Sequence, residues 1–114
     1  MDCIFCQIAE HKLPANIVYE DDDVVAFHDI NPQAPVHVLV IPRKKHIAKI
    51  ADMTAEDQAL VGKVIYIGKQ VAEQLGIAED GFRLVFNNGR HGGQHVYHIH
   101  LHVLGGRPMT WPPG

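Results

Sequence analysis

The sequence predicts an α+β domain, because its strand patterns outnumber its helix patterns and do not alternate with them. The chain has 114 residues, 46% of them hydrophobic, which fits one domain with its own core. Runs rich in β-branched and aromatic residues at 17–20 and 24–28 flank an acidic turn and predict a hairpin. Further strands are predicted at 36–41, ended by Pro42, and at 82–86.

One long helix is predicted to begin at Thr54. Apolar residues recur at helical spacing along this segment and define one buried face. Thr54 followed by Asp57 resembles a capping box, and Gly76 suits the end of the helix. A shorter helix is predicted at 7–10, and the prolines of segment 109–114 predict an irregular tail.

Three histidines recur with a period of two in the stretch that follows Tyr97. In an extended strand successive side chains point to opposite faces, so His98, His100 and His102 are expected to share one face. A single such histidine is often a hydrogen-bonded structural residue. Three on one face favour metal binding, or nucleophilic and acid–base chemistry near neutral pH.

A C-x-x-C pair, Cys3 and Cys6, stands near the start of the chain. Two cysteines this close make no useful structural disulfide, which indicates metal or redox chemistry. Structural zinc takes about four ligands, so the pair supplies half of such a site. The alternative is that both are small buried residues of the core.

A polar loop with three glycines, residues 87–95, leads directly into the histidines. Such a loop can bring backbone amides close to an anion, or it can be a plain connection between strands. His37, alone on its predicted strand, is interpreted from the residues themselves as a core histidine with a hydrogen-bond partner.

Composition excludes several classes of function. A net charge of −3 argues against nucleic-acid binding, and the apolar runs are too short to cross a membrane. The first residues lack the basic region and apolar stretch of a signal peptide, so we expect a cytoplasmic protein.

The segment from His98 to Leu104 resembles the signature of the histidine triad (HIT) superfamily. Residues 27–35, the turn 92–94 and the ending 111–114 resemble its Hint branch, the purine nucleoside phosphoramidases. This resemblance covers essentially the whole chain. It implies an antiparallel sheet of about five strands with one long and one short helix, in a single HIT domain spanning 1–114 that forms a homodimer.

The resemblance also implies a mechanism. His100 would attack the α-phosphorus of an adenosine or guanosine 5′-phosphoramidate such as AMP-lysine, giving a covalent nucleotidyl-histidine and a free amine. Water would then release AMP or GMP, with no catalytic metal. His102 would contact the phosphate, while His98 and His37 would support the site, a role beyond that of a core histidine.

Position 95 is often serine in Hint proteins, where the hydroxyl is thought to assist the leaving group, and here it is His95. A histidine at this position can protonate an amine or donate to phosphate. Asp29 would bind the ribose hydroxyls, and the backbone of the turn 93–95 would donate to phosphate oxygens. The nucleotide-binding residues implied in total are Leu13, Phe27, His28, Asp29, Ile30, Asn87, Gly93, Gln94, His95, His100 and His102.

Members of the superfamily with an N-terminal C-x-x-C pair can bind zinc through two further histidines. The matching positions here are His46, after the Ile-Pro turn, and His98. The resemblance therefore implies a closed, structural zinc site with the ligands Cys3, Cys6, His46 and His98.

Two other functions remain open from the sequence. One is a dinucleoside polyphosphate hydrolase of the Fhit type, against which the short chain and the Hint-like ending argue. The other is a non-catalytic zinc- and nucleotide-binding module that acts through a protein partner.

Overall fold

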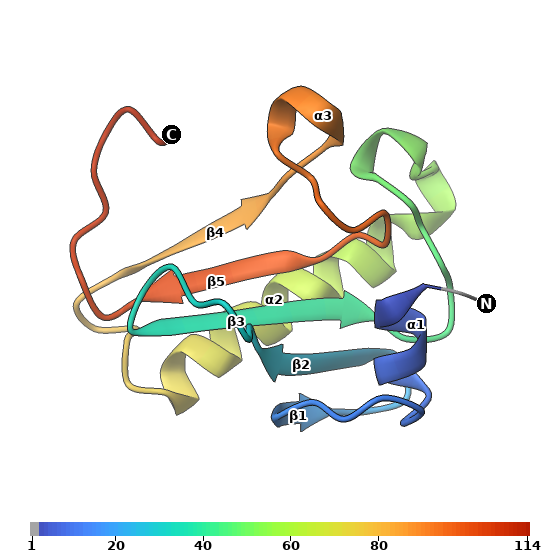
Figure 1. The fold of residues 1–114 in the computed structure, drawn as a ribbon, viewed down its shortest axis with the longest axis horizontal. Coiled ribbons are helices and arrows are strands. Elements are labelled where there is room, and N and C mark those ends of the chain that lie inside the picture. The colour runs from blue at the N-terminus through green and yellow to red at the C-terminus, as the bar shows by residue number, and fades with distance from the viewer. Residues whose placement is uncertain (1–2) are drawn as a thin grey trace.

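In a computed structural model of the protein, the described residues are 3–114. The expectation that the chain has no signal peptide rests in part on residues 1 and 2, which lie outside the described residues. A five-stranded antiparallel sheet has the strand order β1-β2-β3-β5-β4 (Figure 1). The fold class, the number of strands and the first hairpin are confirmed. The strands are β1 (Ile17–Glu20), β2 (Val24–His28), β3 (Val36–Pro42), β4 (Phe82–Phe86) and β5 (Leu101–Gly105).

Helices of unequal length cover opposite faces of the sheet. The long helix α2 (Gln58–Gln74) lies behind the sheet in Figure 1, and the short helix α1 (Ile4–Ala9) lies in front of it. Alternation along β2 separates the two cores, because Val24 packs in the cluster on the α2 side and Val25 in the cluster on the α1 side. One sheet therefore supports two apolar layers.

Both helices begin at residues other than those predicted. The segment after Thr54 first makes a 3-10 turn, Ala55–Asp57, and α2 starts only at Gln58. The predicted capping contact is present, since the Thr54 amide donates to Asp57 Oδ2 at 2.8 Å. Such turns are frequent at helix starts.

The short helix spans 4–9 instead of 7–10. Its start is set by Cys3, whose Sγ accepts a hydrogen bond from the Cys6 amide at 3.4 Å. The side chain therefore takes the place of a capping oxygen and satisfies one of the first helical N–H groups.

The predicted alternation of the histidine stretch is confirmed, although β5 begins only at Leu101 and so excludes His98 and His100. Leu101 packs in the core on the α2 side, and Ile99 is buried against Ile47 beside the start of α2. Gly68 of α2 permits this close approach, because a Cβ there would lie 2.6 Å from Leu101 Cδ2. The imidazoles are thereby left on the α1 side of the sheet.

The loop between β4 and β5 contains one helical turn, α3 (Gly89–Gly92), which the sequence did not predict. Gly93 ends it with φ 80°, a left-handed conformation suited to glycine. The tail 109–114 is irregular, as predicted. Within residues 3–114, no helix has the length and apolar character needed to span a bilayer.

Candidate active site

A cavity of about 720 Å³ lies on the α1 side of the sheet. This volume is within the usual range for small-molecule sites. The structure brings most of the predicted nucleotide-binding residues to its wall, together with His37. Those that line it are Leu13, Phe27, His28, Asp29, Ile30, Asn87, Gly93, His95, His100 and His102.

His100 is oriented by the backbone. Its Nδ1 lies 2.8 Å from the carbonyl oxygen of His98, and because a carbonyl only accepts, Nδ1 carries the hydrogen. In the neutral ring Nε2 then holds a lone pair. Burial lowers the pKa of His100, whose side chain is 8% exposed, so the neutral form predominates at pH 7. The result is an unprotonated ring nitrogen at the cavity, the form that acts as a nucleophile.

The protonation pattern of His37 follows from its partners. The backbone amide of Gln33 donates to His37 Nδ1 at 3.0 Å, so that nitrogen is unprotonated. Burial lowers the pKa of His37, and the neutral ring carries its hydrogen on Nε2. This Nε2–H donates to His102 Nδ1 at 2.8 Å, while Asp29 Oδ2 lies farther from it, at 3.4 Å.

His102 consequently carries its own hydrogen on Nε2. Burial lowers the pKa of His102 to about 4, which keeps the ring neutral. Its Nε2 is buried and has no hydrogen-bond partner among residues 3–114. The rings of His100 and His102 are 4.9 Å apart between centroids. A buried N–H without a partner, beside a nucleophilic nitrogen, is suited to bind an acceptor oxygen of a ligand.

Not all backbone amides of the turn 93–95 are available for the phosphate binding that was expected of them. The amides of Gly93 and Gln94 donate to carbonyls of α3 at 3.2 and 3.0 Å, so both are already engaged. The Gln94 side chain is buried and donates to Ala48 O at 2.7 Å, so it stabilises the loop. It does not line the cavity. Of the three turn amides, that of His95 is the one to which the described structure gives no partner.

Two contacts of the site were missed by sequence reasoning. The ring of Phe5 meets His100 edge to face, with centroids 5.0 Å apart. The sequence could have predicted this contact, because Phe5 lies between Cys3 and Cys6. A metal bound by these cysteines and by His98 would hold α1 against the histidines. The amide of Gln33 gave no signal, because a backbone group carries no residue-specific mark.

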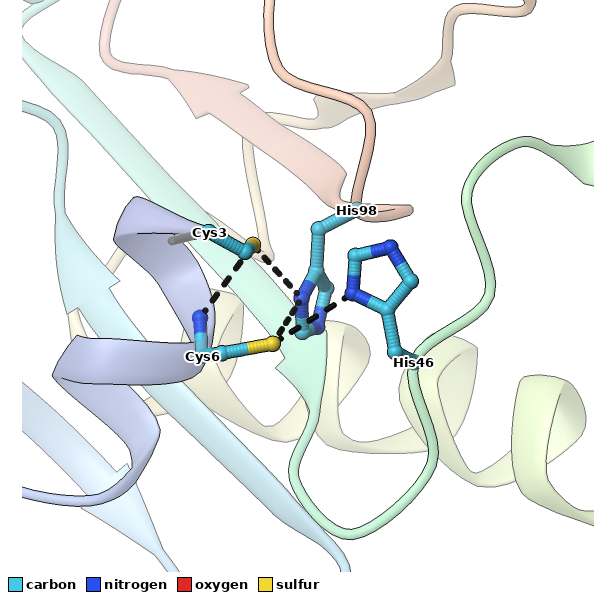
Figure 2. Close-up of side chains that lie close together, drawn as sticks. All are labelled: Cys3, Cys6, His46 and His98. Atoms are coloured by element: carbon cyan, nitrogen blue, oxygen red, sulfur yellow. Dashed lines mark hydrogen bonds between the residues drawn. The ribbon is translucent and has the colours of Figure 1, made fainter. Parts of the chain in front are cut away.

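The four predicted metal ligands converge from three separate segments (Figure 2). Cys6 lies in α1 and Cys3 caps the start of this helix, while His46 comes from the turn after β3 and His98 from the segment before β5. His98 Nδ1 lies 3.3 Å from Cys3 Sγ and 3.4 Å from Cys6 Sγ, and His46 Nδ1 lies 3.3 Å from Cys6 Sγ. All four ligand atoms are within 4.8 Å of one another.

The donor set fits tetrahedral zinc. Bonds of about 2.3 Å to sulfur and about 2.0 Å to nitrogen place such ligands roughly 3.5 Å apart. His98 Nε2 donates to the carbonyl of Pro42 at 3.0 Å, which leaves Nδ1 unprotonated and aimed at the cysteines. Burial lowers the pKa of His98 to about 4, so the ring is neutral, as a metal ligand must be.

The turn that carries His46 is attached to the start of α2. Lys45 Nζ forms an ion pair with Asp57 Oδ1, and the Asp57 residue is only 3% exposed. Asp57 also accepts the Thr54 amide, so one carboxylate joins the turn to the helix start. The contact fixes the backbone next to a metal-ligand position.

Comparison with known proteins places this geometry in a family. Residues 10–109 match the HIT domain. The chain is 52% identical over 108 residues to the purine nucleoside phosphoramidase of Escherichia coli K12, covering 95% of this chain and 90% of that protein. It is 57% identical over 113 residues to an uncharacterized HIT-like protein of Synechocystis, covering 99% and 97%.

Solved structures agree. A HIT family hydrolase from Legionella pneumophila has a TM-score of 0.96 and 54% identity, covering 99% of this chain and all of that one. A histidine triad protein from Clostridium difficile has a TM-score of 0.92 and 43% identity, covering 96% and 95%. The chain therefore belongs to the HIT domain family.

Proposed function

We propose that the protein is a purine nucleoside phosphoramidase that hydrolyses adenosine and guanosine 5′-monophosphoramidates. The observation that carries this proposal is the pairing of an unprotonated His100 Nε2 with the unpartnered Nε2–H of His102 in one cavity. The similarity to the phosphoramidase of Escherichia coli supports the same substrate class.

In the first step His100 Nε2 attacks the α-phosphorus and the P–N bond to the amine breaks. The leaving nitrogen takes a proton, and the nucleotide is held on His100 as a cationic adduct. Water then attacks phosphorus, the bond to Nε2 breaks and a proton is lost to solvent. The products are the nucleoside monophosphate and the free amine.

Other residues of the cavity would bind the phosphate, the ribose and the purine. His102 donates Nε2–H to a phosphate oxygen, where charge develops in the transition state. The amide of His95 and the side chain of Asn87 donate on the same side, and Asp29 accepts from the ribose hydroxyls. The purine is bordered by Leu13, Phe27, His28 and Ile30.

His95 is proposed to protonate the leaving amine. It lines the cavity with an exposed side chain, so it can exchange protons with solvent between turnovers. Burial is the main cause of the lowered pKa of His100, and the neighbouring His95 lowers this pKa further. General acid assistance of this kind contributes about 100-fold or more to a rate.

The site of Cys3, Cys6, His46 and His98 is proposed to hold a structural zinc ion. Four protein ligands leave no open position, so the metal would supply a tether between α1 and the segment before β5, without a role in the chemistry. This assignment is supported by the ligand spacing and by the hydrogen bond of His98 Nε2 to Pro42.

We also propose that the single HIT domain of residues 1–114 works as a cytoplasmic homodimer. Strand β4 is an edge of the sheet, and α2 presents the exposed apolar side chains of Ile65 and Tyr66. A second copy of the chain would cover both. Zinc binding requires reduced cysteines, and the cytoplasm keeps cysteines reduced.

The test is AMP release from AMP-lysine by the wild type and by His100→Ala, with His91→Ala as a matched control because His91 is exposed on α3 and outside the cavity wall. We expect turnover by the wild type and His91→Ala, and none by His100→Ala. Faster cleavage of diadenosine triphosphate than of AMP-lysine would favour a dinucleoside polyphosphate hydrolase. AMP binding without turnover of either substrate would favour a non-catalytic module.

A further inference from the structure

Arg107 lies outside the cavity, yet it contacts the loop that orients the histidines. It is exposed in the turn after β5, and its guanidinium Nη2 donates to the carbonyl of Gln33 at 2.9 Å. The other terminal nitrogen, Nη1, donates to the neighbouring carbonyl of Pro108 at 3.0 Å. The side chain thereby bridges the turn after β5 to the loop between β2 and β3.

That loop is largely exposed, and the turn after β5 contacts it. Gln33 lies on the surface between β2 and β3, and Figure 1 shows the loop beside the end of β5. The turn after β5 packs directly on it, because a Cβ on Gly106 would lie 2.8 Å from Pro35 Cβ. Packing at Gly106 and the hydrogen bond from Arg107 therefore hold the same loop from one side.

The position of Gln33 decides which nitrogens carry hydrogen. Its amide donates to His37 Nδ1, and this contact makes His37 Nε2 the donor to His102. Without the amide, His37 can carry its hydrogen on Nδ1, and the bond to His102 can run in the opposite direction. His102 would then expose a lone pair on Nε2, which repels a phosphate oxygen where the native ring attracts it.

We propose that Arg107 is a positioning residue that, by holding the Gln33 carbonyl, keeps the Gln33 amide on His37 and so keeps His102 Nε2 a hydrogen-bond donor toward the substrate phosphate. Its effect on turnover rests on the proposed phosphoramidase function. Its effect on the His37–His102 pair does not, since that follows from the hydrogen bonds of the protein alone.

Loss of Arg107 should affect turnover more than it affects nucleotide binding. Asp29, the proposed ribose ligand, lies 3.4 Å from His37 Nε2 through its Oδ2, and two hydrogen bonds with backbone groups hold it without Arg107. Its amide donates to His37 O at 2.9 Å, and its Oδ1 accepts the amide of Asn31 at 2.8 Å. Loss of Arg107 should therefore lower kcat more than it raises KM, because His102 acts most strongly on charge that develops in the transition state.

The experiment compares Arg107→Ala, Arg107→Lys and Arg83→Ala in the full chain. Arg83 is the matched control, because its Nη2 also donates to a backbone carbonyl, that of Thr110, at 2.8 Å. With AMP-lysine we expect Arg107→Ala to lose about 10-fold in kcat with KM within about 2-fold, and Arg107→Lys to recover most of the loss. Arg83→Ala should keep both constants within about 2-fold.

A second readout uses ¹⁵N NMR of the imidazole nitrogens at pH 7, which reports whether Nδ1 or Nε2 carries the hydrogen. We expect His102 protonated on Nε2 in the wild type and Arg83→Ala, and a mixture of both forms in Arg107→Ala. An unchanged His102 pattern in Arg107→Ala overturns the proposal, whatever the kinetics. If the wild type shows no turnover, the phosphoramidase function fails, and the NMR comparison still decides the role of Arg107.

Discussion

His100 donates its Nδ1 hydrogen to the backbone carbonyl of His98 at 2.8 Å. The ring of His98 faces away toward the two cysteines, with Nδ1 3.3 Å from Cys3 Sγ. One residue thus contributes its ring to the candidate metal site and its carbonyl to the orientation of the nucleophile. His98 is therefore the residue through which we expect a change at the candidate metal site to reach the active site.

Removal of the metal should lower stability and turnover together. If zinc joins α1 to His98, a chelator should lower Tm on the order of 10 °C, because a ligand that binds only the folded state stabilises it. The loss of His98 order should also reduce kcat. Thermal unfolding with metal analysis checks this, with Cys6→Ser as the control that should be insensitive to the chelator. An unchanged Tm after proven metal loss would contradict a structural role.

The turn that carries His46 should depend on Lys45. Replacing Lys45 with methionine removes the ion pair with the carboxylate of Asp57 and frees the turn from α2. We expect zinc affinity to weaken about 10-fold, since contacts that orient ligands commonly contribute this much. Competition with a chromogenic chelator measures the change. Lys44→Met is the matched control, because exposed Lys44 has no ion pair in residues 3–114. Equal zinc affinities of the two variants would show that Lys45 does not hold the turn that carries His46.

Two glycines of α2 should respond in opposite directions to alanine. A Cβ on Gly68 would lie 2.6 Å from Leu101 Cδ2, in the stretch between two active-site histidines, so Gly68→Ala should destabilise the protein by about 1–3 kcal/mol. Gly62 has nothing within 4 Å, and alanine there should stabilise the helix by about 0.5–1 kcal/mol. Urea unfolding measures both. Equal effects would show that helix propensity alone decides them.

Stability should fall as the pH is lowered from 6.5 toward 4. Burial lowers the pKa of His102 to about 4 in the folded state, while the unfolded chain binds its proton near pH 6.5. The unfolded state therefore holds more protons in this range, and the free energy of unfolding decreases with decreasing pH. Allowing for partial solvent screening, this residue should account for about 1 kcal/mol between pH 7 and pH 5.

Comparison of His102→Gln with the wild type isolates this contribution from acid loss of the proposed zinc ion, which would affect both proteins. The variant should show the shallower decrease in unfolding free energy. His91→Gln, a substitution on the surface of α3, should follow the wild type. Parallel curves for the wild type and His102→Gln would show that His102 does not contribute to the pH dependence.

The sequence predicted the side-chain arrangement of the site well. The period of two placed His98, His100 and His102 on the α1 side of the sheet, because the apolar residues between them are needed by the core on the other side. That separation holds even though β5 starts only at Leu101. The four ligands of the candidate metal site also came together as the resemblance implied.

The hydrogen bonds of the backbone amides could not be predicted from the sequence. The amide of Gln33 on His37 and the engagement of the Gly93 and Gln94 amides by α3 depend on the paths of loops. Every residue except proline has such an amide, so no residue type marks its role. The side chain of Arg107 gave no signal for a similar reason, since its partner is a carbonyl 74 positions away.

We expect His100 to carry the nucleotide during turnover. Mass spectrometry of the protein, denatured at alkaline pH during hydrolysis of AMP-lysine, detects such an adduct, because alkaline conditions preserve a bond between phosphorus and histidine nitrogen. We predict one adenylate per chain, located on His100 and missing from His100→Ala. Rapid AMP release with no adduct on His100, or an adduct on another residue, would show that His100 is not the nucleophile.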